Sequence, residues 1–357
     1  MEFKIIRTEE EFLAERETWT KLYNENKFHC GVTPFQTWEW NYYWWKNRED
    51  KDSLFIIKAF TSKVVEGYAP LIVRKKMVEF IGNRDMDYGR FLINDKPFET
   101  IGGFIDVVKK HKFGFALQEM CARDSQLHIV QRYLQSEKRY LLRHTTGTLY
   151  IETQCFQDFD GYLKTLSSAM RAKTIKVGLK QGYQMQKEPF NDQLKGEIKD
   201  IYTSRQTVRG GADDIEWSFP VLDGLYKNGL AEFYIARSGE KAIGFLISLV
   251  GRYGKNIWLT AFDVDYSACF PGQLLFYQAI KDGFNENCPI VDFMRGDYNF
   301  KARWNAQLDT NYTVYVYRNP FKYLKYKFWF WLRPKLKKLL YALKLKGRRK
   351  KRKNHAK

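Results

Sequence analysis

Residues 290–304 (IVDFMRGDYNFKARW) combine a short apolar run with a dense set of ionisable side chains. The apolar run after Pro289 predicts a buried strand, and Gly296 predicts a turn at its end. The charged residues of the stretch are Asp292, Arg295, Asp297, Lys301 and Arg303. Polar groups where a strand ends lie at the rim of a sheet, a common place for ligands, and close carboxylates and cations shift one another's pKa values. The pattern therefore predicts a reaction site, with an ion-paired strand end as the alternative.

The elements that must position these side chains form a clear series. Residues 162–180 and 192–209 predict helices, and strands are expected at 231–237, 242–250 and 256–263, separated by glycine turns as in a meander. Pro271 and Gly272 predict the start of a helix that runs to about Asn285, and a last strand is expected at 313–317. This order indicates an α+β unit.

The first part of the chain has an order of its own. A strand is expected at 3–7, and Thr8 predicts a helix cap. A very aromatic helix capped by Thr37 is expected to lie between layers, with a ligand-stacking surface as the alternative. Strands are expected at 54–60, 64–73 and 77–81, followed by weaker helix and strand signals over 103–150. Residues 82–92 (GNRDMDYGRFL) follow the third strand with a glycine and then charges, as residues 296–303 do.

Composition limits the classes of protein that fit. With 44% apolar and 17% aromatic residues, the 357-residue chain has material for the cores of two domains. The five cysteines are scattered without metal-binding spacing, which predicts no metal and suits a reducing cytoplasm. Neither a signal peptide nor a transmembrane helix is expected.

The net charge of +19 belongs to the end of the chain. Residues 322–357 hold 16 Lys or Arg and no Asp or Glu, so the rest of the chain has a formal charge of only +3. Residues 321–357 interleave aromatics with lysines, and leucines at 332, 336, 339, 340 and 343 have helical spacing. The tail predicts a basic amphipathic helix on an anionic membrane. Docking on the protein itself and binding of RNA are the alternatives.

The element order of the second part resembles the GCN5-related N-acetyltransferase (GNAT) fold, in which a central strand splays from its neighbour and acyl-CoA lies in the gap. Further motifs resemble the CelD-like, BioF2-like acetyltransferase family associated with polysaccharide biosynthesis. They are residues 159–182, AFDVDY at 261–266 with PGQLL at 271–275, DFMRGDYNFKARW at 292–304, and, earlier, PFQTWEW at 34–40, GYAPL at 67–71 and residues 82–92.

The architecture also resembles the FemABX transferases, which carry two GNAT-like halves and move amino acids from tRNA onto cell-wall precursors. The resemblance implies an α+β fold of tandem GNAT-like halves with mixed central sheets. We expect a first half at 1–150, an acetyltransferase half at 151–320 and the amphipathic tail at 321–357. One departure concerns the glycine-rich loop that holds the CoA pyrophosphate at a helix N-terminus, because Cys269 and Leu274 replace two of its positions.

The resemblance also implies roles for individual residues. Asp297 would act as the base or orient the acceptor, beside Lys301. Asp263 and Tyr266 are second candidates for catalysis, with Tyr266 protonating the leaving thiolate, and a structural turn at the strand end is the alternative for both. Backbone N–H groups at 257–262 would meet the oxyanion. The expected cofactor-binding residues are Gly272, Gln273, Leu274 and Arg295. The expected substrate-binding residues are Asp87, Tyr88, Trp304 and Arg205. A structural turn is the alternative for Asp87 and Tyr88, and a solvated helix face is the alternative for Arg205.

These expectations combine into a cytoplasmic, membrane-peripheral acyltransferase. It would move an acyl group from acetyl-CoA or another acyl-CoA to an amino sugar or related glycan precursor of the cell envelope. Two rivals remain: a FemABX-like transferase that uses aminoacyl-tRNA, which alone would bring in nucleic acid, and a GNAT-fold scaffold without catalysis.

Overall fold

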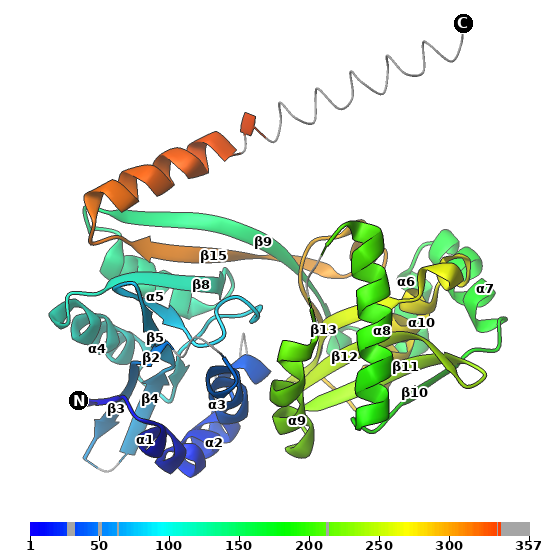
Figure 1. The fold of residues 1–357 in the computed structure, drawn as a ribbon, viewed down its shortest axis with the longest axis horizontal. Helices are drawn as coiled ribbons and strands as arrows, with labels where there is room; N and C mark the ends of the chain where they lie inside the picture. The colour runs from blue at the N-terminus through cyan, green and yellow to red at the C-terminus, as the bar shows by residue number, and fades with distance from the viewer. Residues whose placement is uncertain (27–32, 49–51, 63, 212–213, 334, 337–357) are drawn as a thin grey trace, which may run out of the picture.

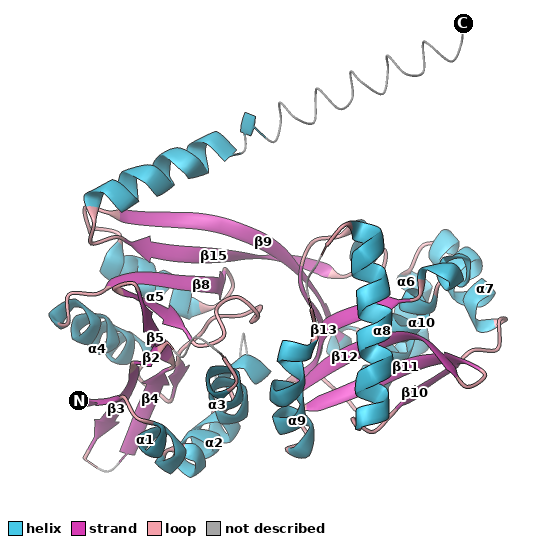
Figure 2. Cartoon of the chain, in the orientation of Figure 1, coloured by secondary structure: helices cyan, strands magenta, loops and turns pink. Residues whose placement is uncertain are grey.

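A computed structural model describes residues 1–26, 33–48, 52–62, 64–211, 214–333 and 335–336 (Figure 1). Two bodies of strands and helices lie side by side, joined by long strands that run from one to the other (Figure 2). Leucines 339, 340 and 343, part of the predicted tail stripe, lie outside the described residues.

A small antiparallel sheet and five helices make up much of the first body. The sheet has the strand order β1 (Glu2–Ile6), β3 (Ile56–Thr61), β4 (Val64–Ala69) and β7 (Leu92–Ile93). The helices are α1 (Glu9–Ala14), α2 (Arg16–Glu25), α3 (Trp38–Lys46), α4 (Pro97–Lys110) and α5 (Ser125–Leu134).

A mixed sheet of eleven strands runs through both bodies. In spatial order its strands are β10 (Gln184–Lys187), β11 (Ala231–Ser238), β12 (Lys241–Gly251), β13 (Gly254–Phe262), β14 (Ile290–Arg295), β9 (Tyr140–Glu152), β15 (Gln307–Val316), β8 (Gly114–Cys121), β6 (Met77–Phe80), β5 (Leu71–Arg74) and β2 (Ser53–Leu54). The parallel neighbours are β13 with β14 and β6 with β8.

Helices complete the second body, some of them packed on β11, β12 and β13 and others on the helix at Pro271–Asn285. They are α6 (Phe159–Thr165), a π-helix at Ala169–Ile175, α7 (Lys176–Leu179), α8 (Asp192–Arg209), α9 (Phe219–Lys227), α10 (Pro271–Asn285) and α11 (Asn299–Ala302). A separate apolar core that includes Tyr162, Phe276, Phe293 and Trp304 lies under α10.

Local signals in the sequence explain several helix starts. The Thr8 hydroxyl accepts from Glu11 N at 3.2 Å, and the Thr37 hydroxyl accepts from Trp40 N at 3.1 Å, which satisfies amides that begin α1 and α3. The aromatic side chains of α3 are buried on several faces, among them Trp38, Trp40 and Trp44. This confirms that α3 lies between layers.

The expected α+β class with mixed sheets is confirmed. The predicted bounds of α8 and of the meander β11–β13 agree with the structure to within two residues, and α10 begins and ends as predicted. The last strand is longer than predicted, since β15 begins at Gln307 instead of Thr313. The expected boundary at residue 150 falls inside β9, and β15 returns to pair with β8 of the first body.

The described part of the tail is helical at residues 320–333, and Figure 1 shows this helix pointing away from the rest of the molecule. In the described part of the chain, every helix is too short or too polar to span a bilayer.

Candidate active site

The site is built around two parallel strands that separate. β13 and β14 pair at three positions, Gly254 with Ile290, Lys255 with Val291 and Asn256 with Asp292. Beyond Asn256, β13 stays paired with β12 alone, through a bulge that leaves Trp258 as an extra residue. In the part of the chain that the structure describes, no strand pairs with the other edge of β13 at 257–262, so the backbone groups that point to that edge are open to a ligand.

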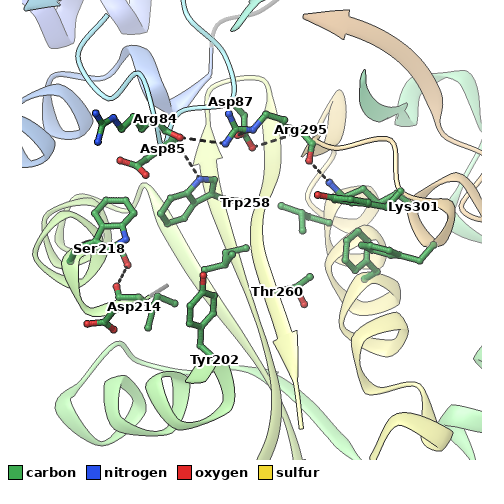
Figure 3. A pocket seen from close by; sticks show the side chains of 17 residues that line it. Arg84, Asp85, Asp87, Tyr202, Asp214, Ser218, Trp258, Thr260, Arg295 and Lys301 are labelled. Atoms are coloured by element: carbon green, nitrogen blue, oxygen red, sulfur yellow. Dashed lines mark hydrogen bonds and ion pairs between the residues drawn. The ribbon is translucent and has the colours of Figure 1, made fainter. Parts of the chain in front are cut away.

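A cavity of about 1030 Å³ lies in this gap (Figure 3). Both bodies contribute to its walls. The lining residues are Ile257, Trp258, Leu259 and Thr260 of β13; Arg295, Tyr298, Phe300 and Lys301 after β14; Arg84, Asp85 and Asp87 of the first body; and Tyr202, Asp214, Ile215, Trp217, Ser218 and Phe276. A volume of this order accommodates a cofactor-sized ligand.

Lys301 is held by the end of the strand that precedes it. The side chain is buried and donates to the carbonyl oxygens of Phe293 at 2.5 Å, Arg295 at 2.8 Å and Met294 at 3.4 Å. Burial lowers its pKa to about 8, against the opposing effect of the nearby carboxylates of Asp87 and Asp292. Lys301 therefore places a cation in the cavity that changes charge near physiological pH.

Asp87 and Arg295 join the two glycine-and-charge stretches noted in the sequence. Arg295 Nε lies 3.2 Å from Asp87 Oδ1, and the Arg295 backbone N–H donates to Asp87 Oδ2 at 3.2 Å. Burial raises the pKa of Asp87 to about 6, although Arg295 and Lys301 oppose the shift. Figure 3 shows Asp87 between Arg295 and the side of the first body, above Trp258.

Tyr88 and Asp292 lie behind this pair and do not line the cavity. The Tyr88 hydroxyl donates to Asp292 Oδ2 at 2.8 Å, and both side chains are buried. Burial and the Asp292 charge raise the pKa of Tyr88, which keeps the hydroxyl protonated as a donor. The bond connects residues 204 positions apart and fixes the loop that carries Asp87 to the strand that leads to Lys301.

An aromatic wall closes the end of the cavity away from Lys301. The Trp258 indole donates to the Asp85 carbonyl at 3.1 Å and meets the rings of Trp40 and Trp217 edge-on. Four lining residues were not predicted from the sequence: Trp258, Trp217, Arg84 and Asp85. No sequence signal marks Trp258, because the bulge that turns it into the cavity breaks the alternating pattern of the strand.

Asp297 and Trp304 are not among the residues that line the cavity. Asp297 is exposed beside Gly147 of β9, near enough to Lys301 to favour its charged form. Trp304 is fully buried and stacks on Phe276 at 6.3 Å between ring centroids, so it supports the wall that Phe276 forms.

Asp263 and Tyr266 lie together just past the end of β13, at a separate place. Asp263 forms an ion pair of 2.8 Å with Lys241 and caps the turn through Asp265 N, which lowers the pKa of the carboxyl. Lys241 Nζ lies 5.1 Å from the ring centroid of Tyr266. The structure therefore does not bring these two residues to the cavity with Lys301.

The expected cofactor residues at the start of α10 differ in exposure. Leu274 is fully buried and Gly272 and Gln273 are half-buried. Pro271 has no N–H, and the amides of Gln273 and Leu274 both donate to the Phe270 carbonyl, which leaves the Gly272 amide of the first turn for a ligand. Arg205 of α8 lies nearby, with its guanidinium 4.8 Å from the Phe262 ring centroid.

Of the carboxylates that line the cavity, Asp87 and Asp85 form ion pairs with Arg295 and Arg48, and Asp214 accepts from the Glu216 backbone N–H. Among the residues that the structure describes, no three His, Cys, Asp or Glu are grouped to hold a metal ion.

Comparison with known proteins agrees with this architecture. Residues 201–302, from α8 to α11, match the family model described as an acetyltransferase (GNAT) domain. No curated protein matches the chain at a significant level.

Solved structures show the same fold over both bodies. The structure of FemX superposes with a TM-score of 0.65 at 12% identity, covering 91% of this chain and 99% of FemX. The C-terminal domain of a protein described as a lysylphosphatidylglycerol synthetase from Agrobacterium fabrum gives 0.58 at 10% identity, covering 88% and 95%. A tandem GNAT protein from the clavulanic acid biosynthesis pathway gives 0.50 at 10% identity, covering 88% and 98%. The fold is therefore that of tandem GNAT proteins.

Proposed function

We propose that this protein transfers an acyl group from acyl-CoA to the amine of an amino sugar or related precursor in cell-envelope or surface-polysaccharide biosynthesis. The observation that carries the proposal is the gap between β13 and β14, which opens after three paired positions into a large cavity with titratable groups on its far side. The match of residues 201–302 to a GNAT domain supports acyl transfer as the reaction class.

The open edge of β13 offers backbone N–H groups that can donate to the acyl carbonyl oxygen. When an amine attacks a thioester, the carbonyl oxygen gains negative charge, and fixed N–H donors stabilise it. Among the described residues, no strand pairs with 257–262 on the cavity side, so the backbone amides that point to that side can serve this oxygen without breaking a sheet bond. In this proposal the thioester lies along β13, and the amine approaches from the side of Asp87.

In the proposed reaction, Asp87 accepts a proton and Lys301 stabilises negative charge. Asp87, ionised above a pKa of about 6, accepts the proton of the acceptor amine directly or through one water. Lys301, protonated below a pKa of about 8, keeps a positive charge near the leaving thiolate or the substrate phosphate. Arg295 holds the Asp87 carboxylate in place through two contacts.

The aromatic wall favours a sugar-like acceptor. Trp217 and Trp258 meet at 90° with ring centroids 6.3 Å apart and offer apolar faces, while Arg84, Asp85 and Asp214 offer polar groups beside them. Apolar surface with a few fixed polar groups is the usual composition of a small-molecule site. A sugar ring presents C–H faces and hydroxyl groups that match both.

A second candidate donor, aminoacyl-tRNA, is favoured by the start of α10. A pyrophosphate at a helix N-terminus needs several free amides, and the first turn of α10 leaves that of Gly272. Arg171, Lys173, Lys176 and Lys180 are exposed on the helices that pack beside α10, where they suit a longer polyanion. The likeness to FemX extends over 91% of this chain.

Calorimetry on the full-length protein distinguishes the donors. We expect free CoA, acetyl-CoA or a longer acyl-CoA to bind with micromolar affinity. We expect Gly272→Ala to weaken that binding at least fivefold, because the new Cβ would lie 3.0 Å from the Phe262 ring beside the free amide. Gly196→Ala in α8 is the matched control, since nothing lies within 4 Å of its added Cβ.

The outcomes separate the proposals. CoA binding that Gly272→Ala weakens and Gly196→Ala leaves unchanged supports the acyl-CoA donor. Absence of binding to every CoA species, with retention of aminoacyl-tRNA in a gel-shift experiment, would replace it with the second candidate. Absence of both would exclude both donors.

A further inference from the structure

Helix 320–333 exposes a continuous apolar stripe. Phe321, Leu324, Phe328 and Trp331 follow one another at spacings of three and four residues, which places them on one face. Their exposed fractions are 79%, 59%, 58% and 56%. Large apolar side chains this exposed mark an interaction surface when they are contiguous.

The opposite face of the same helix contacts the protein through its aromatic rings. Tyr326 stacks on Tyr317 at 5.3 Å between ring centroids, and Phe330 lies 5.9 Å from the ring of Tyr315. The Arg143 guanidinium of β9 lies 4.7 Å from the Phe330 ring centroid. The helix is therefore seated on the end of the β9–β15 pair with its stripe facing outward.

The charges around the stripe have one sign. Lys322, Lys325, Lys327, Arg333 and Lys335 are all exposed, and the sequence contains no Asp or Glu after Asp309. Lys335 Nζ lies 3.5 Å from the ring centroid of Trp331, so a cation borders the stripe itself. The surface thus combines an exposed apolar area, which a partner can bury, with a positively charged rim.

We propose that this face of helix 320–333 docks on an anionic lipid bilayer and holds both bodies at the membrane surface. Phe, Leu and Trp side chains would enter the boundary between headgroups and acyl chains, where aromatic residues gather, and the lysines would contact anionic headgroups. The seated face would keep the β9–β15 pair attached to the docked helix. The inference is independent of which donor the cavity uses.

A bilayer fits this face better than the other occupants. RNA would use the lysines through phosphate contacts but leaves most of the apolar stripe in water. A second copy of the chain would cover the stripe, but it would bring the like-charged rims together, which opposes association.

Vesicle flotation of the full-length protein tests the proposal. The probes are vesicles of phosphatidylcholine alone and of phosphatidylcholine with phosphatidylglycerol in equal parts, each at low and high salt. We expect at least tenfold stronger partitioning onto the anionic vesicles, reduced by salt. The variant F321S/L324S/F328S/W331S should lose at least tenfold of that partitioning.

A matched control removes the same number of exposed apolar side chains elsewhere. The variant L13S/V64S/V208S/L308S replaces residues that are 44%, 55%, 63% and 65% exposed on the two bodies, and it should partition as the wild type does within twofold. Both variants keep residues 337–357, so a difference between them reports on the stripe and not on the basic end of the chain.

Three results would overturn the proposal. The first is equal partitioning of the stripe variant and the wild type onto anionic vesicles. The second is equal partitioning of the wild type onto neutral and anionic vesicles. The third is absence of vesicle binding together with a dimer in solution, or an RNA complex, that the stripe variant alone loses.

Discussion

Both bodies contain a pair of parallel strands that separate, but the gap between the strands is open in one body and filled in the other. In each, two parallel strands pair at three positions and then separate: Met77–Glu79 of β6 with Gly114–Ala116 of β8, and Gly254–Asn256 of β13 with Ile290–Asp292 of β14. In the second body the gap is the large cavity. In the first body the chain itself occupies the gap.

The first gap is filled by the loop at residues 86–91, which is buried throughout. The Gly89 amide donates to the Glu119 carbonyl of β8 at 2.9 Å, in the place where a neighbouring strand would bond. The Phe91 backbone N–H donates to Gln126 Oε1, and the Phe91 carbonyl accepts from Gln126 Nε2, each at 3.0 Å. The same loop places Asp87 at the second gap. The loop that fills the gap of the first body therefore also positions Asp87 at the open gap of the second body.

The largest effect is expected on stability, from a substitution that disrupts the filled gap. A Cβ at Gly89 would lie 2.0 Å from the Gln118 carbonyl oxygen and 2.8 Å from the Phe80 ring, so Gly89→Ala must displace the loop. We expect a loss of about 3 kcal/mol or more in the free energy of unfolding. Urea denaturation measures it, with Gly196→Ala as the control that stays within about 1 kcal/mol of the wild type.

A substitution in the open gap is expected to lower transfer activity instead of stability. Lys301→Met keeps most of the side-chain length but removes the charge, and we expect acyl transfer from the donor that binds in calorimetry to an amino-sugar acceptor to fall about 100-fold or more. Circular dichroism and the thermal midpoint check that the variant is folded. A folded variant with wild-type kcat/KM would remove Lys301 from the mechanism.

The pH profile should show both groups of the open gap. Asp87 must be ionised to take a proton, so activity rises as pH increases through about 6. Lys301 must be protonated, so activity falls as pH increases through about 8. The profile of kcat/KM is therefore expected to be a bell between these values, and Asp87→Asn should remove the acidic limb. A rise through pH 8 would instead make Lys301 the base.

A smaller effect is expected where the two gaps are connected. Tyr88→Phe removes the donor of the buried bond to Asp292 Oδ2 and leaves that carboxylate with the Met294 backbone N–H at 2.6 Å and Arg123 at 3.9 Å. We expect a loss of about 1–2 kcal/mol in unfolding free energy and a rise in KM larger than the fall in kcat. A wild-type KM would show that the bond stabilises the bodies without positioning Asp87.

The smallest effect is expected outside both gaps. Asp263→Asn weakens the ion pair with Lys241 at a site that does not border the cavity with Lys301, so we expect kcat/KM to stay within about twofold of the wild type. Steady-state kinetics beside Lys301→Met measures this. A large loss would return Asp263 to the catalytic set that the sequence predicted.

Local patterns allowed much of the fold to be predicted. Caps at Thr8 and Thr37, the Pro271 helix start and the alternation of β11–β13 act over a few residues, and all are present in the structure. The start of β15 was missed because Gln307 to Asn311 are mostly polar, and pairing with β9 and β8 makes them a strand.

The candidate site was predictable only in part, because its contacts join distant segments. Asp87 and Arg295 were each identified, but nothing in their spacing indicates that they pair across 208 positions. The position of Trp304 in the core and of Trp258 at the cavity wall depends on a buried helix and a bulge, which one sequence does not specify. Tertiary packing decides which side chains of a polar stretch face a cavity.

The pairing of β9 with β15 has a consequence for the order of folding during synthesis. The first body needs β15 beside β8, yet residues 153–306 separate β9 from β15. A ribosome therefore delivers nearly the whole second body before the first can close its sheet. Until then β8 has an unpaired edge, which is a template for aggregation. We expect chains that stop before residue 307 to need a chaperone to stay in solution, whereas complete chains cover that edge themselves.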